Sequence, residues 1–524
     1  MAAAGLGAAA LVATALNGHV PLDIEAGAPA RLIAGTMPLV AGVVASFAVL
    51  RPRPAWLVVL LLAPYWDTAQ VSWQVGDLQV ISQSIFLAAL GVGVLLRDGT
   101  TPASIGEWAV GLRRAPGGGV WGAGAWTPVR AGGVALAALL VLALAGTAVS
   151  PDRVTSATVL LHGILEPVAM ALLLFALRPD RRFMAWLAIA LAVSVALGGA
   201  LDIMQSVPAM KTLSVLQSRR LLFSRLTFFN VGILGEMLAM AMPLLLAAVL
   251  GRRRLGLGRG TVAVLLVALV FAVATLFLTF SKSAWLATSG ASLLVVLLLI
   301  GSWRRRAAIV AMAAILSTAV VPWPALVLQV APPINDAYRS VMISLVGQSR
   351  FDSWNPATLS GRGSLVERFY ATRAAFQMAV DHPVLGIGLD RFGVEYTGRY
   401  KPAEAHLSVD SAHSMWAEDA AELGFPALLC VLLIYASAAF ALWRVYRAPP
   451  DEPARILAAA FLAALVAWLL VATAFAGDMY RPWRNMSSDF VMMAVVTAAA
   501  FALYRLSRAG MRHDEREPDA AATA

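Results

Sequence analysis

The chain has 524 residues, of which 60% are apolar and 13% charged, with a formal net charge of +10 and a mean hydropathy of +0.76. Soluble domains carry about 25% charged residues and disordered chains are poor in apolar ones, so this composition excludes both classes. The single cysteine, Cys430, excludes a disulfide framework and a cysteine-based zinc site. The composition therefore predicts an all-α polytopic membrane protein.

A helix needs about 20 apolar residues to cross the ~30 Å hydrocarbon layer of a bilayer. Segments that approach this length and apolar character lie near residues 2–16, 31–50, 55–70, 79–96, 131–149, 158–177, 183–203, 229–250, 261–280, 284–301, 307–330, 422–443, 456–475 and 488–505. The first and third segments are short. We therefore expect about 12–14 transmembrane helices.

The basic residues are distributed unevenly between the two sides of this predicted bundle. Alternate connections and the C-terminal tail together hold 23 of the 40 basic residues, and this side is expected to be cytoplasmic, with both termini. The other side carries two long connections, 204–228 and 331–421. No basic tract with interleaved aromatic residues lies outside the spans, so a nucleic-acid partner is not expected.

The spans and connections divide the chain into five parts. They are an N-terminal bundle (1–203), central helices with the first outer arginine loop (204–330), the long outer loop (331–421), C-terminal helices (422–505) and a cytoplasmic tail (506–524). A loop as long as 331–421 between membrane helices is usually functional.

Within the long loop, apolar residues recur at helical spacing: Val366, Phe369, Phe376 and Val380. This pattern predicts an amphipathic helix that lies on the outer leaflet and ends before Pro383. A tight turn follows at Gly386-Ile387-Gly388. A second helix is predicted to open near His413 and to run through Gly424 into the next span.

Several short patterns follow one another in this region: Ser360-Gly361-Arg362, Asp381-His382-Pro383, Gly386-Ile387-Gly388, Phe392, Ala412-His413 and Glu422-Leu423-Gly424. Their order resembles the C-terminal signature of the bacterial O-antigen ligase and O-antigen polymerase superfamily. Upstream, the segment from Arg225 to Asn230 and the run from Leu278 to Trp285 are similar to weaker family patterns, so the resemblance covers roughly 220–440. The chain departs from the family at Ser414, at Lys282 and at Pro426, where asparagine, arginine and glycine are usual.

The resemblance implies a membrane glycosyltransferase of cell-surface polysaccharide biosynthesis. It would move a glycan from a polyprenyl-diphosphate carrier, such as undecaprenyl diphosphate, to a glycan or lipid acceptor, with the long loop on the periplasmic side of the bacterial inner membrane. His413 is implied as the base that takes the proton of the acceptor hydroxyl, with inversion at the anomeric carbon. Arg362, Arg225 and Lys282 are implied as partners of the diphosphate. No His, Asp or Glu cluster shows metal-ligand spacing, so neither a metal nor another cofactor is expected.

Each of these residues has a simpler interpretation as well. His413 at a helix start also fits a capping or interfacial histidine, and Arg362 a solvated loop arginine. Arg219 and Arg220 are alternatives to Arg225. Lys282 at the end of a span also fits a side chain that reaches the interface.

Other functional classes stay open from the sequence. A ligase, a polymerase and a protein O-glycosylating ligase differ mainly in the acceptor. A transporter or lipid-linked-glycan flippase is the alternative from another class, although the internal repeats usual in transporters are not seen. His162 and Glu166, four residues apart in one span, are either functional or a pair that fixes helix packing.

Overall fold

The computed structural model describes residues 43–66, 72–75, 78–98, 127–177, 179–210, 231–278, 282–309, 361–405, 408–474 and 488–514. Helices dominate these residues, as predicted. The exception is one antiparallel hairpin of β1 (Ser72–Val75) and β2 (Leu78–Ile81), in which Ser72 pairs with Ile81.

The N-terminal helices after residue 50 are α3 (Pro52–Trp66), α4 (Ser82–Asp98), α6 (Pro128–Val149), α7 (Arg153–Val159), the π-helix η1 (Leu160–Leu165), α8 (Glu166–Ala176) and α9 (Arg181–Met210). The central helices are α11 (Val231–Leu250), α12 (Arg259–Leu278) and α13 (Lys282–Leu299). The C-terminal part holds α18 (Gly361–Asp381), α19 (Phe392–Glu395), the π-helix η2 (Tyr396–Tyr400), α20 (Met415–Leu423), α21 (Phe425–Arg447), α22 (Glu452–Ala474) and α23 (Ser488–Asp514).

Seven of the described helices are long and apolar enough to cross a membrane: Pro128–Val149, Arg153–Ala176, Arg181–Ala200, Arg259–Leu276, Phe425–Arg447, Glu452–Thr473 and Val491–Arg508. Three shorter apolar helices, Pro52–Leu61, Leu234–Leu250 and Ser283–Leu299, accompany them. This confirms a polytopic membrane protein. The predicted span at 2–16 and most of that at 307–330 lie outside the described residues.

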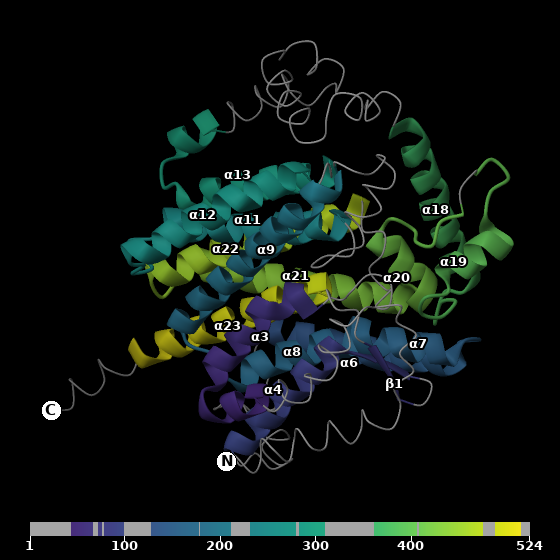
Figure 1. The fold of residues 1–524 in the computed structure, drawn as a ribbon, viewed down its shortest axis with the longest axis horizontal. Coiled ribbons are helices and arrows are strands. Elements are labelled where there is room, and N and C mark those ends of the chain that lie inside the picture. The colour runs from purple at the N-terminus through teal and green to yellow at the C-terminus, as the bar shows by residue number, and fades with distance from the viewer. Residues whose placement is uncertain are drawn as a thin grey trace.

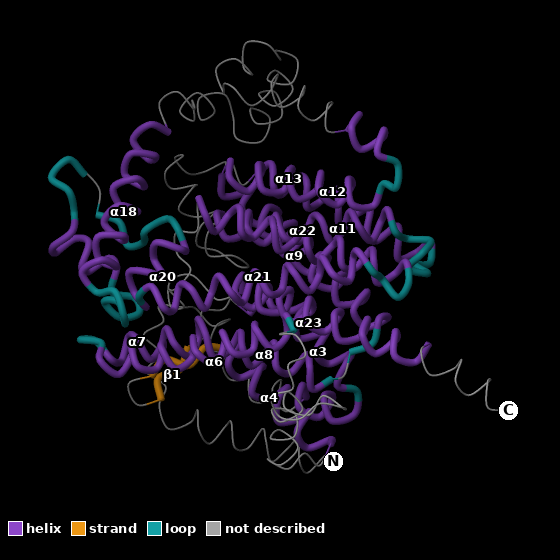
Figure 2. The backbone as a smooth tube through the Cα atoms, turned by 180° about the vertical axis from the view of Figure 1, so that it is seen from behind, coloured by secondary structure: helices purple, strands orange, loops and turns teal. Residues whose placement is uncertain are grey.

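The long helices run roughly side by side, and α18, α19 and α20 gather at one end of the bundle (Figure 1), as the reverse view also shows (Figure 2). Helix α9 is central, with 83% of its span buried, whereas the spans of α6 and α12 are 33% buried. Helix α12 exposes Val264, Val267, Val270 and Phe271. Such apolar side chains are stable at the surface of a membrane protein, because lipid acyl chains cover them and keep them out of water.

Three sequence-based boundaries differ from the structure. The span predicted at 79–96 starts as strand β2 and becomes helical at Ser82, and α23 continues to Asp514 rather than ending at 505. The helix predicted to run through Gly424 into the next span is interrupted there, because Gly424 has a φ of +85° that separates α20 from α21. A Cβ at Gly424 would lie 2.4 Å from the carbonyl oxygen of Val384, so only glycine fits this corner.

Candidate active site

Helices α18, α19, η2 and α20 form a small outer unit with its own apolar core. Helix α18 contributes Ala371, Ala374, Ala375 and Met378, which pack with Phe392, Tyr396, Ala417 and Ala421. The predicted helix and its end at Asp381 are confirmed. Its packed face is the alanine-rich one, and Phe369, Phe376 and Val380 of the predicted apolar stripe are exposed. Whether this stripe lies on the outer leaflet stays a prediction.

The glycine turn packs against the end of α20, within the outer unit. Backbone N–H groups of Ile387 and Gly388 donate to the carbonyl oxygens of Ala421 (2.8 Å) and Glu422 (3.1 Å). Gly386, with a φ of +66°, lies so close to α20 that a Cβ would stand 2.2 Å from the carbonyl carbon of Glu422. The predicted turn therefore brings the backbone of residues 386–388 into direct contact with the backbone at the end of α20.

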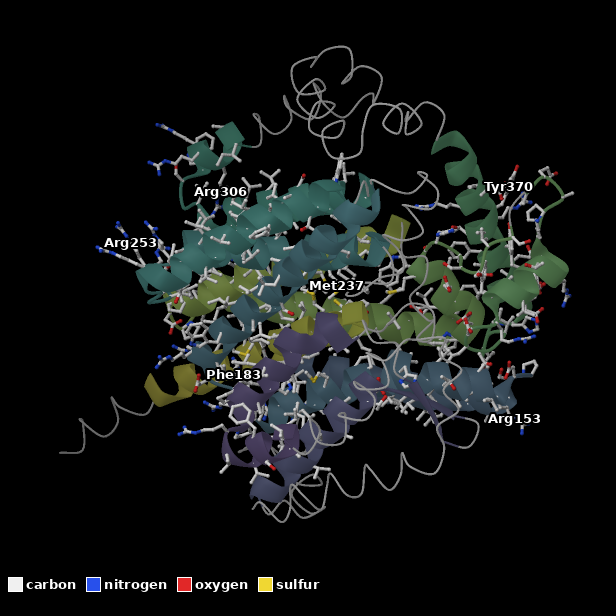
Figure 3. The ribbon with its side chains drawn as sticks, in the orientation of Figure 1. Arg153, Phe183, Met237, Arg253, Arg306 and Tyr370 are labelled. Carbon is white, nitrogen blue, oxygen red and sulfur yellow. The ribbon has the colours of Figure 1, made fainter. Side chains whose placement is uncertain are left out.

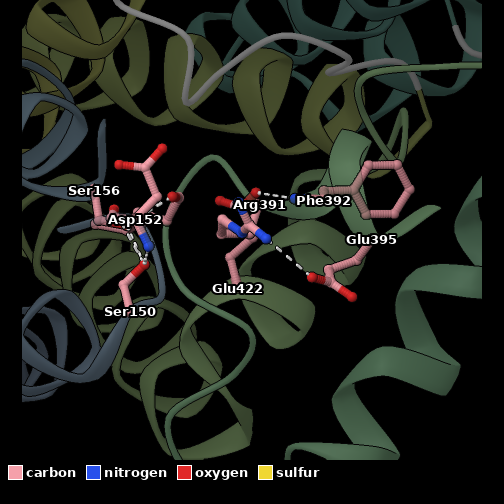
Figure 4. Close-up of polar contacts among 8 residues, drawn as sticks. Ser150, Asp152, Ser156, Arg391, Phe392, Glu395 and Glu422 are labelled. Atoms are coloured by element: carbon pink, nitrogen blue, oxygen red, sulfur yellow. Dashed lines mark hydrogen bonds and ion pairs between the residues drawn. The ribbon is translucent and has the colours of Figure 1, made fainter. Parts of the chain in front are cut away.

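The Glu422 carboxylate completes this contact. Its oxygens accept hydrogen bonds from the backbone N–H groups of Asp390 and Phe392, both at 3.0 Å (Figure 4). The Glu422 side chain is buried, and Asp390 adopts a positive φ of +59°. These contacts give Glu422 a structural role, since it holds the loop between Gly388 and α19 in place.

The same loop also contacts the membrane bundle at the turn between α6 and α7. Ser156 donates to the carbonyl oxygen of Leu389 (2.9 Å) and to Ser150 Oγ (2.8 Å) (Figure 4). Hydrogen bonds from the Thr155 backbone and hydroxyl lower the pKa of the Asp152 carboxyl, and the positive charge of Arg391 adds to this shift. The outer unit is therefore hydrogen-bonded to the bundle at the turn between α6 and α7.

His413 lies in the segment between η2 and α20, and this segment is held from both sides. The hydroxyl of Thr372 on α18 donates to the Ala412 carbonyl oxygen (2.9 Å), and the Ala412 N–H donates to Glu418 Oε2 on α20 (3.0 Å). His413 itself has a φ of +54°, and its N–H donates to Ser411 Oγ (3.1 Å). A non-glycine residue with positive φ persists only where neighbours impose it, and such positions cluster at functional sites.

The electrostatic surroundings keep the His413 imidazole neutral. Burial lowers its pKa to about 4 from the usual 6.5, and the positive charge of Arg368 on α18 contributes in the same direction. At neutral pH the ring therefore has a nitrogen lone pair available to accept a proton. The ring thus stays unprotonated over a wide pH range, and the low pKa also makes it a weaker proton acceptor than an ordinary histidine.

Buried acids line α20 behind this segment. Glu418, Asp419 and Glu422 are each at most 3% exposed. Burial, and then the charge of Glu422, raise the pKa of the Asp419 carboxyl well above its usual value. Glu418 and Glu422 instead accept backbone hydrogen bonds.

The structure describes the predicted cationic partners only in part. Arg362 lies in the first turn of α18, six residues before Arg368, and Lys282 is the first residue of α13. The side chains of both residues, and the whole of Arg225, lie outside the described part of the structure. A diphosphate site formed by these three residues stays a prediction.

His162 and Glu166 form a buried polar cluster within the membrane bundle. His162 Nδ1 lies 2.9 Å from Glu166 Oε1, and the Ser84 hydroxyl of α4 donates to the same carboxylate oxygen. The π-helix η1, which includes His162, directly precedes Glu166. The contacts match the packing interpretation of this pair, in which the polar groups satisfy one another and join α4 to α8.

A double-mutant cycle tests this packing role. E166L alone should lower the free energy of unfolding in micelles by about 3–5 kcal/mol, because it leaves the buried His162 without its carboxylate. The variant H162L/E166L should be less destabilised than E166L, since it removes both polar groups together. The single variant H162L completes the cycle. If the loss of unfolding free energy in H162L/E166L equalled the sum of the losses in H162L and E166L, the packing role would be contradicted.

Within the described residues, no three His, Cys, Asp or Glu side chains lie close enough together to hold a metal ion. Sequence reasoning missed Thr372 and Glu418, which position the His413 segment, and Arg368, whose charge acts on the His413 ring. The acidic residue in the first turn of the helix after His413 was the available signal for Glu418. Nothing in the local sequence pairs Thr372 with Ala412, 40 residues away.

Comparison with known proteins adds one finding. A family model described as O-antigen ligase matches residues 267–432. The matched segment runs from α12 through the outer unit into α21, and it includes Lys282, Arg362 and His413 but not Arg225. No curated protein matches the chain.

Proposed function

Because residues 267–432 match a family model described as O-antigen ligase, we propose that the chain is a membrane glycosyltransferase with His413 as its catalytic base. The donor is a glycan on a polyprenyl-diphosphate carrier, and the acceptor is a hydroxyl of a second glycan or lipid. The observation that carries this proposal is the position and environment of His413. It lies within the matched segment, on a constrained backbone, and its pKa of about 4 keeps it unprotonated.

The reaction that His413 supports is a displacement at the anomeric carbon. The acceptor oxygen attacks this carbon from the face opposite the diphosphate, and its proton passes to the neutral imidazole. The bond between the anomeric carbon and the diphosphate oxygen breaks, and its electron pair leaves with polyprenyl diphosphate. The product has inverted configuration, and the proton on His413 is returned to solvent.

The leaving diphosphate requires cations, and Arg362, Arg225 and Lys282 are the proposed partners. A guanidinium at about 4 Å from a phosphate oxygen contributes a gross attraction of roughly 4 kcal/mol at an effective dielectric constant of about 20, before desolvation is subtracted. Attraction that grows as negative charge develops on the diphosphate accelerates bond breaking. Lys282 supplies charge without the two-pronged geometry of arginine.

We place this chemistry on the periplasmic face of a bacterial inner membrane, with both termini in the cytoplasm. The support is the excess of basic residues on the connections at the other end of the bundle. Figure 3 shows Arg253 and Arg306 at the end of the bundle opposite Tyr370 and Arg153. The outer unit is thus expected where lipid-linked glycans are assembled outside the cytoplasm.

The proposal is tested with purified protein in lipid vesicles that contain a polyprenyl-diphosphate-linked oligosaccharide, with and without a separate acceptor. A ladder of longer lipid-linked glycans from the donor alone indicates a polymerase. Transfer that requires an added lipid A-core or protein acceptor indicates a ligase. No release of polyprenyl diphosphate with any of these acceptors would contradict the proposed activity.

The pH dependence of catalysis follows from the depressed pKa of His413. The value of kcat/KM should stay constant from about pH 8 to about pH 5 and fall only as the pH approaches the pKa of about 4, because the base is lost when it protonates. With an ordinary histidine, activity at about pH 5.5 would already be roughly a tenth of the maximum. R368Q should move the fall to higher pH, since it removes a positive charge that disfavours the imidazolium. A profile that falls near pH 6.5 in the wild type would contradict this account.

A further inference from the structure

A cavity of about 360 Å³ lies at the end of the bundle opposite His413. It is lined by Leu298, Arg306, Trp443, Tyr446, Arg447, Pro449 and Arg455. Arg447 ends the 23-residue helix α21, whose other end adjoins the outer unit. At 1.5 Å per residue, roughly 33 Å of helix separate the cavity from the candidate active site, so it belongs to a different surface. We call it the arginine pocket.

The arginine pocket is lined by positive charge only. Arg306, Arg447 and Arg455 line it, and no acidic residue is among its lining residues in the described part of the chain. Of the nearest acids in sequence, Asp451 pairs with Arg181, and Glu452 pairs with Arg254 at 2.7 Å. Glu452 also pairs with the lining residue Arg455, at 3.7 Å. The pocket thus keeps an excess of positive charge that an anion would neutralise.

Aromatic walls hold the guanidinium groups in position. Arg447 lies 5.7 Å from the centre of the Trp443 ring, and Arg455 lies 5.2 Å from that of Tyr446. The two rings stack with centroids 5.6 Å apart, and the Tyr446 hydroxyl donates to the Leu298 carbonyl oxygen (2.9 Å). Guanidinium groups ordered in this way lose little entropy when they bind a phosphate oxygen.

An exposed apolar stripe on α21 leads to the pocket from the membrane interior. Leu429, Leu433, Phe440 and Trp443 are between 41% and 57% exposed. Their spacing of three, four and seven residues puts them on one face of the helix, and Arg447 follows four residues after Trp443 on the same face. An acyl chain that lies along this stripe would bring its headgroup to Arg447.

From this continuity we infer that the arginine pocket binds the phosphate headgroup of an anionic phospholipid from the leaflet on that side, expected to be the cytoplasmic one. Basic pockets at helix ends on that side of a membrane suit such headgroups. The charge, the aromatic walls and the adjoining apolar stripe favour a lipid over a soluble phosphate compound, which lacks the chains. The inference does not depend on glycosyl transfer.

The test is lipid retention by the full chain in micelles, measured by native mass spectrometry after addition of equal amounts of phosphatidylglycerol and phosphatidylcholine. The wild type should retain phosphatidylglycerol selectively. R447Q/R455Q should retain it about thirtyfold less, at about 1 kcal/mol for each arginine near the surface. The control R252Q/R253Q removes the same charge from exposed arginines at the same end of the bundle and should retain lipid like the wild type.

Two results would overturn the inference. If both double variants lost phosphatidylglycerol retention equally, or if the wild type retained both lipids equally, lipid binding would reflect general surface charge and not the arginine pocket. Displacement of the lipid by millimolar glycerol 3-phosphate would assign the pocket to a soluble phosphate compound instead. If R447Q/R455Q elutes as aggregate in size-exclusion chromatography, R306Q replaces it, with R304Q as its matched control.

Discussion

Replacement of His413 by alanine should lower kcat by about 10²–10⁴, the usual contribution of a general base. The KM for the lipid-linked donor should change little, because the proposed diphosphate partners are other residues. The variant should fold normally, since the contacts that hold the segment use the Ala412 backbone, the Thr372 hydroxyl and the Glu418 side chain, and not the His413 ring. The measurement is steady-state release of polyprenyl diphosphate by reconstituted protein.

His382 provides the matched control for this prediction. It is exposed in the turn directly after α18, within the same outer unit. H382A should keep nearly wild-type kcat, as its ring has no role in the proposed chemistry. Wild-type activity in H413A, or an equal loss in both variants, would show that His413 is not the base.

Replacement of Gly386 by alanine should disrupt the outer unit. The added Cβ would overlap backbone atoms of Glu422 and Leu423 at 2.2–2.5 Å, and alanine is strained at a φ of +66°. Strain and overpacking together should cost about 3 kcal/mol or more of unfolding free energy, and transfer activity should be lost with the positioning of His413. Limited proteolysis should cleave the segment between α18 and α20 far faster than in the wild type.

Gly398 serves as the control because a Cβ there has no atom within 4 Å and its φ is not positive. G398A should resist proteolysis like the wild type. If G386A were as resistant and as active as G398A, the glycine turn would not be the contact that fixes the outer unit.

Much of the fold could be predicted because lipid imposes a simple pattern. A span must be about 20 apolar residues long, and the segments predicted from 131–149 onward match described helices wherever those residues are described. Boundaries that depend on tertiary contact were missed. The break at Gly424 arises from contact with Val384, a residue 40 positions earlier, and no local propensity signals it.

In the candidate site, too, features with a local sequence pattern could be predicted, whereas features that depend on tertiary contact could not. His413 was identified from a short motif, and its role as the base stays a prediction. The apolar stripe of α18 was predicted to face the outer leaflet, whereas the alanine face that packs within the outer unit was not predicted. Alanines allow α18 to approach the rest of the outer unit closely, and this leaves Phe369 and Phe376 exposed.

The most direct test of the account is the stoichiometry of a single turnover by the wild-type protein in vesicles. We predict one polyprenyl diphosphate released for each glycosidic bond formed, with inverted configuration at the new bond, and both products formed about 10²–10⁴ times more slowly by H413A. Movement of intact lipid-linked glycan across the bilayer without diphosphate release would contradict the account and indicate a transporter.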